Sequence, residues 1–223
     1  MTAVQQNAHG VSQLTMTAED SANRKILVLD AMGVIYAEGD DGQNLLYPFI
    51  LEHGRLRNVV EVIRLYSEAS LGKITAEEFW RRAGVDSSLE DEYLALHRLS
   101  EGLVEFLEKA TANGFEIWCL SNDVSEWSRK LRRKFDLEKY FRGFVISGDE
   151  GVRKPDAAIY QRLRDAADCL VSDIIFVDDR LRNIEVAARL GMRCVLFNPV
   201  DSRASEHDFP VANTFAELSN LLS

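Results

Sequence analysis

The sequence predicts an α/β fold in which a parallel sheet forms the middle of three layers and a helical segment is inserted after the first strand. Residues 26–29 form an unbroken apolar run, typical of a strand covered on both faces. Helical and strand-like patterns alternate from residue 100 onward, whereas residues 37–99 carry only helical patterns. With 223 residues, 46% of them hydrophobic, the chain is long enough for one globular unit with a small accessory domain.

The N-terminal part contains a predicted leader and the first strand. Residues 1–24 are rich in Gln, Ser, Thr, Ala and Asn and show no periodicity, which predicts a flexible leader. The strand lies within residues 25–36, and Asp30 ends its apolar run. Ligands bind beyond the carboxyl ends of parallel strands, so Asp30 is a candidate nucleophile that would attack phosphorus and form an aspartyl-phosphate. Gly33 would let the backbone approach a ligand closely.

Residues 37–99 predict an inserted helical domain. Apolar residues recur at helical spacing over residues 56–65, and residues 75–80 begin with a threonine and carry glutamates, as at a capped helix start. These roughly sixty residues far exceed the dozen or so that a crossover between parallel strands needs. We therefore expect this segment to lie over the crevice at the strand ends.

Residues 25–36 and 100–223 together predict the Rossmann-like core. A helix to about residue 113 precedes a strand over 115–120, a helix from 125, a strand over 144–147 and a helix from 155. A strand over 174–177, a helix over 180–190, a strand over 193–197 and a final helix within 213–223 complete the series. Such alternation is typical of right-handed βαβ units around a parallel sheet.

Composition restricts the partners and the location. The net charge of −10 and pI near 5.0 argue against nucleic acid, and the short basic run over residues 129–134 is best interpreted as the solvated face of a helix. Three widely separated cysteines predict no disulfide framework and no zinc site. No apolar stretch approaches the length of a membrane span, so we expect a cytoplasmic protein.

Three later strands are also followed by polar residues. Ser121 and Asn122 follow the second strand and offer a hydroxyl and backbone N–H groups to phosphate oxygens. Lys154 precedes a proline at a predicted helix start. Asp178 and Asp179 end another strand and would repel each other unless a cation or a solvated turn relieved the repulsion, and a divalent ion such as Mg²⁺ would suit them.

Asp30, Ser121, Lys154 and the Asp178–Asp179 pair occur in an order and strand context that closely resembles the haloacid dehalogenase-like hydrolase superfamily. The resemblance covers residue 25 to the end and includes the subclass whose helical cap follows the first strand. It implies hydrolysis of a small phosphorylated substrate with Mg²⁺ as cofactor.

The resemblance also implies a role for each matching residue. Asp30 would be the nucleophile and a Mg²⁺ ligand, and Lys154 would neutralise charge on it and on the transferred group. Ser121 and the Asn122 amide would hold phosphate. The remaining positions complete the metal site: Asp178 and Asp179 would bind Mg²⁺, Asn183 would support their turn, and the Met32 carbonyl would be a further ligand.

Met32 departs from the family pattern. Phosphatases that resemble this chain carry a second aspartate two positions after the nucleophile, which protonates the leaving alcohol and activates water. A thioether cannot transfer protons, and losing general acid–base help costs about 3 to 5 kcal/mol of barrier for a poor leaving group. Acyl phosphates and phosphoanhydrides need no such proton. Another acid could come from the insertion, where the nearest candidates are Tyr36, Glu38, Asp40, Asp41 and His53.

Three other interpretations stay open on the sequence. The chain could bind phosphate without turnover, or it could be a dehalogenase or a lyase-type relative. Dehalogenases also lack the second aspartate, but they need no metal, so the Asp178–Asp179 pair favours phosphoryl chemistry. The sequence indicates neither the substrate nor the oligomeric state.

Overall fold

The computed structural model describes residues 24–197 and 208–223, and the predicted leader over residues 1–23 lies outside this part. A parallel sheet of six strands has the order β3-β2-β1-β4-β5-β6. The four central strands of the sheet are β1 (Lys25–Leu29), β2 (Phe115–Ser121), β4 (Ile174–Asp178) and β5 (Arg193–Phe197). The two edge strands, β3 (Gly143–Ile146) and β6 (Val211–Ala212), are short. The predicted α/β fold is confirmed.

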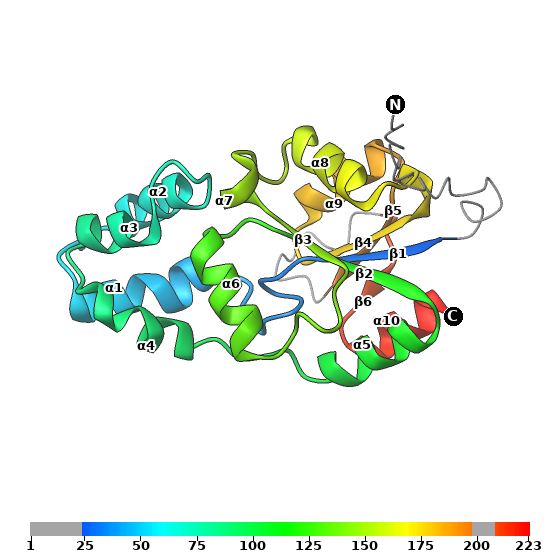
Figure 1. Cartoon of the computed structure of the whole chain (residues 1–223), viewed down its shortest axis with the longest axis horizontal. Coiled ribbons are helices and arrows are strands. Elements are labelled where there is room, and N and C mark those ends of the chain that lie inside the picture. The colour runs from blue at the N-terminus through cyan, green and yellow to red at the C-terminus, as the bar shows by residue number, and fades with distance from the viewer. Residues whose placement is uncertain (1–23, 198–207) are drawn as a thin grey trace, which may run out of the picture.

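Helices cover both faces of the sheet (Figure 1). One face carries α8 (Ala157–Ala167) and α9 (Leu181–Arg189), and the other carries α5 (Leu103–Ala112) and α10 (Phe215–Leu222). Because successive strand side chains point to opposite faces, β1 contributes to both cores. Leu27 and Leu29 belong to the cluster that includes Phe106 and Leu218, whereas Ile26 belongs to the second cluster. This double burial explains why the first strand is apolar at every position of residues 26–29.

The named elements of the insertion between β1 and α5 are all helices, joined by turns and loops. Its elements are η1 (Gly42–Leu46), α1 (Tyr47–His53), α2 (Val59–Ala69), α3 (Ala76–Ala83), η2 (Ser87–Leu89) and α4 (Glu90–Ala95). They lie together beyond the end of the sheet toward which β1 runs (Figure 1). Its two connections to the core run side by side, since Ala37 N donates to Arg98 O at 3.0 Å and Ser100 N donates to Ile35 O at 3.0 Å.

A buried carboxylate fastens the insertion to helix α6 (Ser125–Lys134) of the core. Glu90 of α4 accepts hydrogen bonds from the indole nitrogens of Trp80 at 2.7 Å and Trp127 at 2.8 Å. The two indole rings lie 5.1 Å apart, and Lys130 pairs with Glu90 at 2.8 Å. A hydrogen-bonded buried carboxylate with a cationic partner is stable in such an apolar cluster.

Several predicted boundaries are wrong by one or two residues. The strand predicted over 144–147 spans Gly143–Ile146, because Ser147 begins a short helix, α7 (Ser147–Glu150), and its hydroxyl accepts from Asp123 N at 3.1 Å. The helix predicted from residue 155 begins at Ala157, where Asp156 caps it by accepting from Ala158 N. A 3₁₀ turn, η3 (Val171–Asp173), precedes β4. Among the described residues, no helix is both long and apolar enough to cross a bilayer.

Candidate active site

The register of the central strands brings the predicted catalytic residues together. Leu29 lies level with Cys119 of β2 and with Val177 of β4, so the next residue, Asp30, lies beside Asp178 and close to Ser121. The backbone continues this alignment, since Asp30 N donates to Val177 O at 2.9 Å. Parallel strands that share a register deliver their following residues to the same edge of the sheet.

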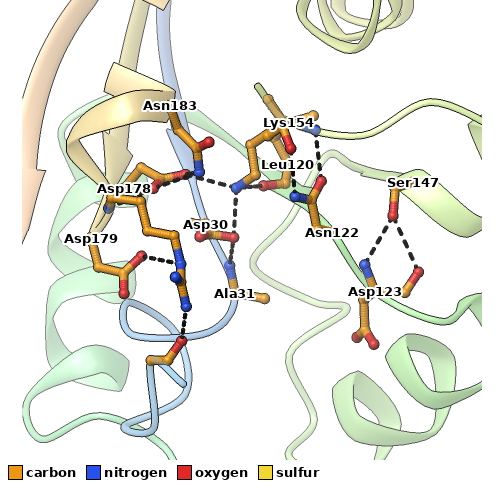
Figure 2. Close-up of polar contacts among 12 residues, drawn as sticks. Asp30, Ala31, Leu120, Asn122, Asp123, Ser147, Lys154, Asp178, Asp179 and Asn183 are labelled. Carbon is orange, nitrogen blue, oxygen red and sulfur yellow. Dashed lines mark hydrogen bonds and ion pairs between the residues drawn. The ribbon is translucent and has the colours of Figure 1, made fainter. Parts of the chain in front are cut away.

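Lys154 lies between the two carboxylates that the strands deliver (Figure 2). Its ammonium nitrogen lies 2.7 Å from Asp30 Oδ1, 2.8 Å from Asp178 Oδ2 and 2.7 Å from Leu120 O. An ammonium has three hydrogen-bond donors, so these three acceptors occupy all of them. The side chain of Lys154 is 1% exposed, and the two carboxylates raise its pKa although burial lowers it. Lys154 is therefore a charged, fully bonded anchor for the carboxylates.

Asp178 accepts several hydrogen bonds, whereas one oxygen of Asp179 accepts none from the described part of the chain. Asn183 donates to both Asp178 oxygens at 3.0 Å, and Arg180 N donates to Asp178 Oδ1 at 2.8 Å. Asp179 Oδ1 is buried and has no hydrogen-bond partner among the described residues, and the Arg180 guanidinium is 3.8 Å away. Gly33 lies directly against this carboxylate: an added Cβ would lie 2.5 Å from Asp179 Oδ2.

The carboxylates of Asp30, Asp178 and Asp179 fit a divalent cation. One oxygen from each lies within 4.8 Å of the others, and all three residues are buried. Burial raises the pKa of Asp30 well above its usual value, Lys154 opposes this, and the other two aspartates add to it. Burial likewise raises the pKa of Asp179 to about 7, with Asp178 contributing. Hard cations such as Mg²⁺ are bound by carboxylate oxygens, and Asp179 Oδ1, which accepts no hydrogen bond among the described residues, is available for one.

Ser121 and Asn122 occupy different positions relative to the cavity. Ser121 Oγ is buried without a hydrogen-bond partner among the described residues and lines the cavity beside Asp30, so it is free to donate to a ligand. The Asn122 side chain is already engaged: it donates to Lys154 O at 2.9 Å and accepts from Lys154 N at 2.7 Å. Its amide group therefore positions the Lys154 backbone, which leaves the Asn122 backbone N–H for a ligand.

Met32 lines the same cavity and is 8% exposed. Of the five acids and bases that the sequence offers near it, two line the cavity, Asp40 and Asp41. Asp41 is the more buried of these, and desolvation raises the pKa of its carboxyl to about 7. Tyr36, Glu38 and His53 are not among the residues that line this cavity.

Sequence reasoning missed the arginines of this site. The cavity has a volume of about 160 Å³, and besides the residues above it is lined by Arg153, Arg180 and Arg182. They lie next to predicted site residues, Arg153 before Lys154 and the other two after Asp179. Their position in the sequence close to Lys154 and to the Asp178–Asp179 pair was the signal that could have identified them.

This arrangement, with an aspartate at the end of the first parallel strand, a buried lysine and an acidic pair, defines a hydrolase core of the α/β class. The model of the haloacid dehalogenase-like hydrolase family matches residues 24–191, so the chain belongs to that family.

Curated relatives match parts of the chain. A drimenol cyclase from Aspergillus calidoustus is 36% identical over 107 residues, covering 47% of this chain and 20% of the cyclase. A chloroplast flavin mononucleotide hydrolase from Arabidopsis thaliana is 28% identical over 148 residues, covering 64% of this chain and 60% of the hydrolase. A sesquiterpene phosphatase from Aspergillus oryzae is 27% identical over 129 residues, covering 54% of this chain and 66% of the phosphatase. The matched region thus spans from a fifth to about two thirds of these relatives' own lengths.

Solved structures show the same fold. A phosphatase of this family from Thermococcus onnurineus superposes with a TM-score of 0.68 at 18% identity, covering 89% of this chain and 98% of that one. A family enzyme from Bacteroides thetaiotaomicron, crystallised with magnesium, superposes with a TM-score of 0.67 at 20% identity, covering 82% of this chain and 98% of that enzyme.

Proposed function

We propose that the chain is a Mg²⁺-dependent phosphatase that hydrolyses a small phosphorylated metabolite through an aspartyl-phosphate on Asp30. The observation that carries this proposal is the contact of the buried Lys154 ammonium with both Asp30 and Asp178, with Asp179 close enough to share a cation. Relatives named as a flavin mononucleotide hydrolase and a sesquiterpene phosphatase support phosphate-ester chemistry.

Asp30, Asp178 and Asp179 would hold Mg²⁺, together with the backbone carbonyl of Met32. Solved family members crystallised with magnesium support this choice of cation. When bound, the ion supplies positive charge to the phosphoryl oxygens. Asp30 and Asp178 share one buried ammonium, and Asp179 lies 3.8 Å from the Arg180 guanidinium, so three carboxyl groups face two monovalent cations and a divalent ion adds favourable charge.

The chain's own residues then position and transfer the phosphoryl group. Lys154 holds Asp30 Oδ1 at 2.7 Å, which leaves the second carboxylate oxygen to attack phosphorus. Ala31 N also donates to Oδ1, at 2.6 Å, and so restricts rotation of the carboxylate. Ser121 Oγ and the Asn122 N–H donate to phosphoryl oxygens. Preorganised donors of this kind stabilise the charge of the transition state without reorganising.

Because Met32 cannot donate a proton, the rate of hydrolysis depends strongly on the leaving group. Without a proton donor at this position, alkyl phosphates react slowly, and substrates whose leaving group departs as a stable anion react faster. Residues 37–99 act as a cap that selects substrate and excludes water from the cavity, and residues 25–36 and 100–223 act as the catalytic core. This division is supported by Ile63, Tyr66 and Ser67 of α2, which line the cavity opposite Asp30. A cytoplasmic location stays a prediction.

The test is intact-mass analysis and phosphate release after incubation with Mg²⁺ and acetyl phosphate. The native chain should gain one phosphoryl group, and Asp30→Asn should gain none. If the native chain binds Mg²⁺ and phosphate but is never phosphorylated, the chain is a binding module and the phosphatase proposal is wrong. Release of halide from a 2-haloacid without Mg²⁺ would instead assign it to dehalogenation.

A further inference from the structure

Arg153, Arg180 and Arg182 bring three guanidinium groups to one small cavity in a chain whose net charge is −10. They come from two separate segments, the connection before α8 and the turn between β4 and α9. The arginines are close enough to affect one another: burial lowers the pKa of Arg153, and the charges on Arg182 and Arg180 lower it further. Such like charges repel, so an anion that lies among them is stabilised.

Carboxylates of the protein neutralise Arg180 in part: burial lowers its pKa, but the charges of nearby aspartates, Asp179 foremost, raise it overall. The other two arginines have no such partner in the part of the chain that the structure describes. Neither Arg153 nor Arg182 forms an ion pair with a carboxylate of the described residues. Arg153 donates to the Ser70 hydroxyl at 3.2 Å, and Arg180 donates to Gly39 O at 2.6 Å and lies 3.8 Å from Asp179. Arg182 is exposed at the start of α9. Guanidinium groups bind phosphate oxygens in bidentate geometry, and these retain donors for that purpose.

Lys154 is not available for this role. All three of its donors are used by Asp30, Asp178 and Leu120 O, so the arginines are the cations of the cavity that can reach a substrate. The transferred phosphoryl group lies at Asp30 and Ser121 in the proposed function. Three further cations exceed what one phosphoryl group needs, which points to a second anionic group on the substrate.

Two carboxyl groups of the insertion also line the cavity, and Asp40 contributes to the raised pKa of Arg180, but neither forms an ion pair with Arg153 or Arg182 among the described residues. Asp40 accepts from Gln43 Nε2 at 2.8 Å. Asp41 is buried, and desolvation favours its neutral form. A substrate anion thus adds favourable contacts that these side chains do not already provide.

The missing proton donor at Met32 restricts how the second anionic group is joined to the first. A second phosphate on another carbon would leave an alkoxide at the reacting bond, which needs a proton that position 32 does not supply and that would have to come from Asp40 or Asp41 of the insertion. A second phosphate joined through a bridging oxygen leaves as a phosphate monoester, whose second pKa is about 6. Such a group departs as an anion at neutral pH without a general acid.

We propose that the natural substrate is an organic diphosphate, whose terminal phosphoryl group is transferred to Asp30 while the arginines bind the inner phosphate. This inference rests on the proposed phosphatase function. A carboxylate oxygen of Asp30 forms a bond to the terminal phosphorus, the bond from that phosphorus to the bridging oxygen breaks, and its electron pair stays on the departing monophosphate. Water then hydrolyses the aspartyl-phosphate, releasing inorganic phosphate and a proton to solvent and regenerating Asp30.

The reaction should stop after one phosphate. The monophosphate product has only an alkoxide to lose, so it is hydrolysed slowly for want of the acid at Met32. Accumulation of the organic monophosphate therefore distinguishes this enzyme from one that removes both phosphates.

The experiment compares isopentenyl diphosphate, isopentenyl monophosphate and acetyl phosphate with Mg²⁺ and the full chain. We expect kcat/KM for the diphosphate to exceed that for the monophosphate by at least about 10²-fold, the smallest effect typical of a lost general acid. Phosphorus NMR should show one inorganic phosphate released per diphosphate and a persistent monophosphate. Arg182→Gln should lower the ratio of kcat/KM for diphosphate to kcat/KM for acetyl phosphate about tenfold, as loss of one charge-assisted contact does.

Arg189→Gln is the matched control. It removes the same charge from the same helix, and Arg189 does not line the cavity. It should leave the ratio unchanged. Three results would each overturn the inference. The monophosphate and the diphosphate could react at equal rates, the two arginine variants could have equal effects, or a hexose 1,6-bisphosphate could be hydrolysed as fast as the diphosphate. If acetyl phosphate labels Asp30 while the diphosphate is untouched, only the substrate assignment fails; if neither reacts, the proposed phosphatase function fails with it.

Discussion

Replacing Lys154 by methionine tests the charge balance at the centre of this site. The substitution keeps most of the side-chain volume and removes an ammonium that lies 2.7 Å from Asp30 and 2.8 Å from Asp178. At an effective dielectric constant of 20, two charges at this separation attract by about 6 kcal/mol, much of which offsets desolvation. Breaking a buried pair of this kind costs about 3 to 5 kcal/mol, and we expect this loss of unfolding free energy at pH 7.

The measurement is urea unfolding at pH 5 and pH 8, with and without Mg²⁺. The loss should be smaller at pH 5, because protonated carboxyl groups no longer need the ammonium. Without Lys154 the carboxylates bind a cation more tightly, so Mg²⁺ should stabilise the variant more than it stabilises the native chain. Lys139→Met is the matched control: Lys139 pairs with Asp136 at 2.6 Å, but its side chain is 54% exposed, so we expect a change below about 1 kcal/mol.

Two results would refute this reasoning. If Lys154→Met and Lys139→Met change stability equally, the buried ammonium does not hold the carboxylates in the way the distances indicate. If the loss for Lys154→Met is the same at both pH values, unpaired carboxylates are not its cause.

Three further substitutions test separate parts of the site. Met32→Asp should raise turnover of isopentenyl monophosphate by about 10²-fold or more and that of acetyl phosphate little, since only the alkoxide needs a proton; a uniform change across substrates would contradict this. Gly33→Ala should weaken Mg²⁺ binding at least tenfold in calorimetry, because its Cβ would lie 2.5 Å from Asp179 Oδ2, whereas Gly114→Ala, with the same φ of +80° but open space around it, should not. Burial raises the pKa of Asp41 in the folded chain to about 7, above its unfolded value, so the free energy of unfolding should fall as pH rises from about 4 to 7. Asp41→Asn should remove this part of the pH dependence, which amounts to at most about 4 kcal/mol. An unaltered pH profile in this variant would show that Asp41 is solvated.

The local sequence determined most of the fold and the members of the site. The unbroken apolar run of β1 indicates that this strand is buried on both faces. In a parallel sheet, the residues that follow neighbouring strands lie at the same edge of the sheet. Asp30, Ser121, Lys154, Asp178 and Asp179 could therefore be predicted together, and the structure places all five around one cavity or in contact with its lining.

Tertiary structure alone decided how these residues are used. The contacts of the Lys154 ammonium, of the Asn122 amide with Lys154 and of Ser70 with Arg153 join residues that are 24 to 124 positions apart. Such contacts depend on side-chain direction and on how the insertion meets the core, and neither leaves a periodic pattern in the sequence. For the same reason only the folded chain shows that Asp41 lines the cavity while His53 does not, and that three arginines meet there.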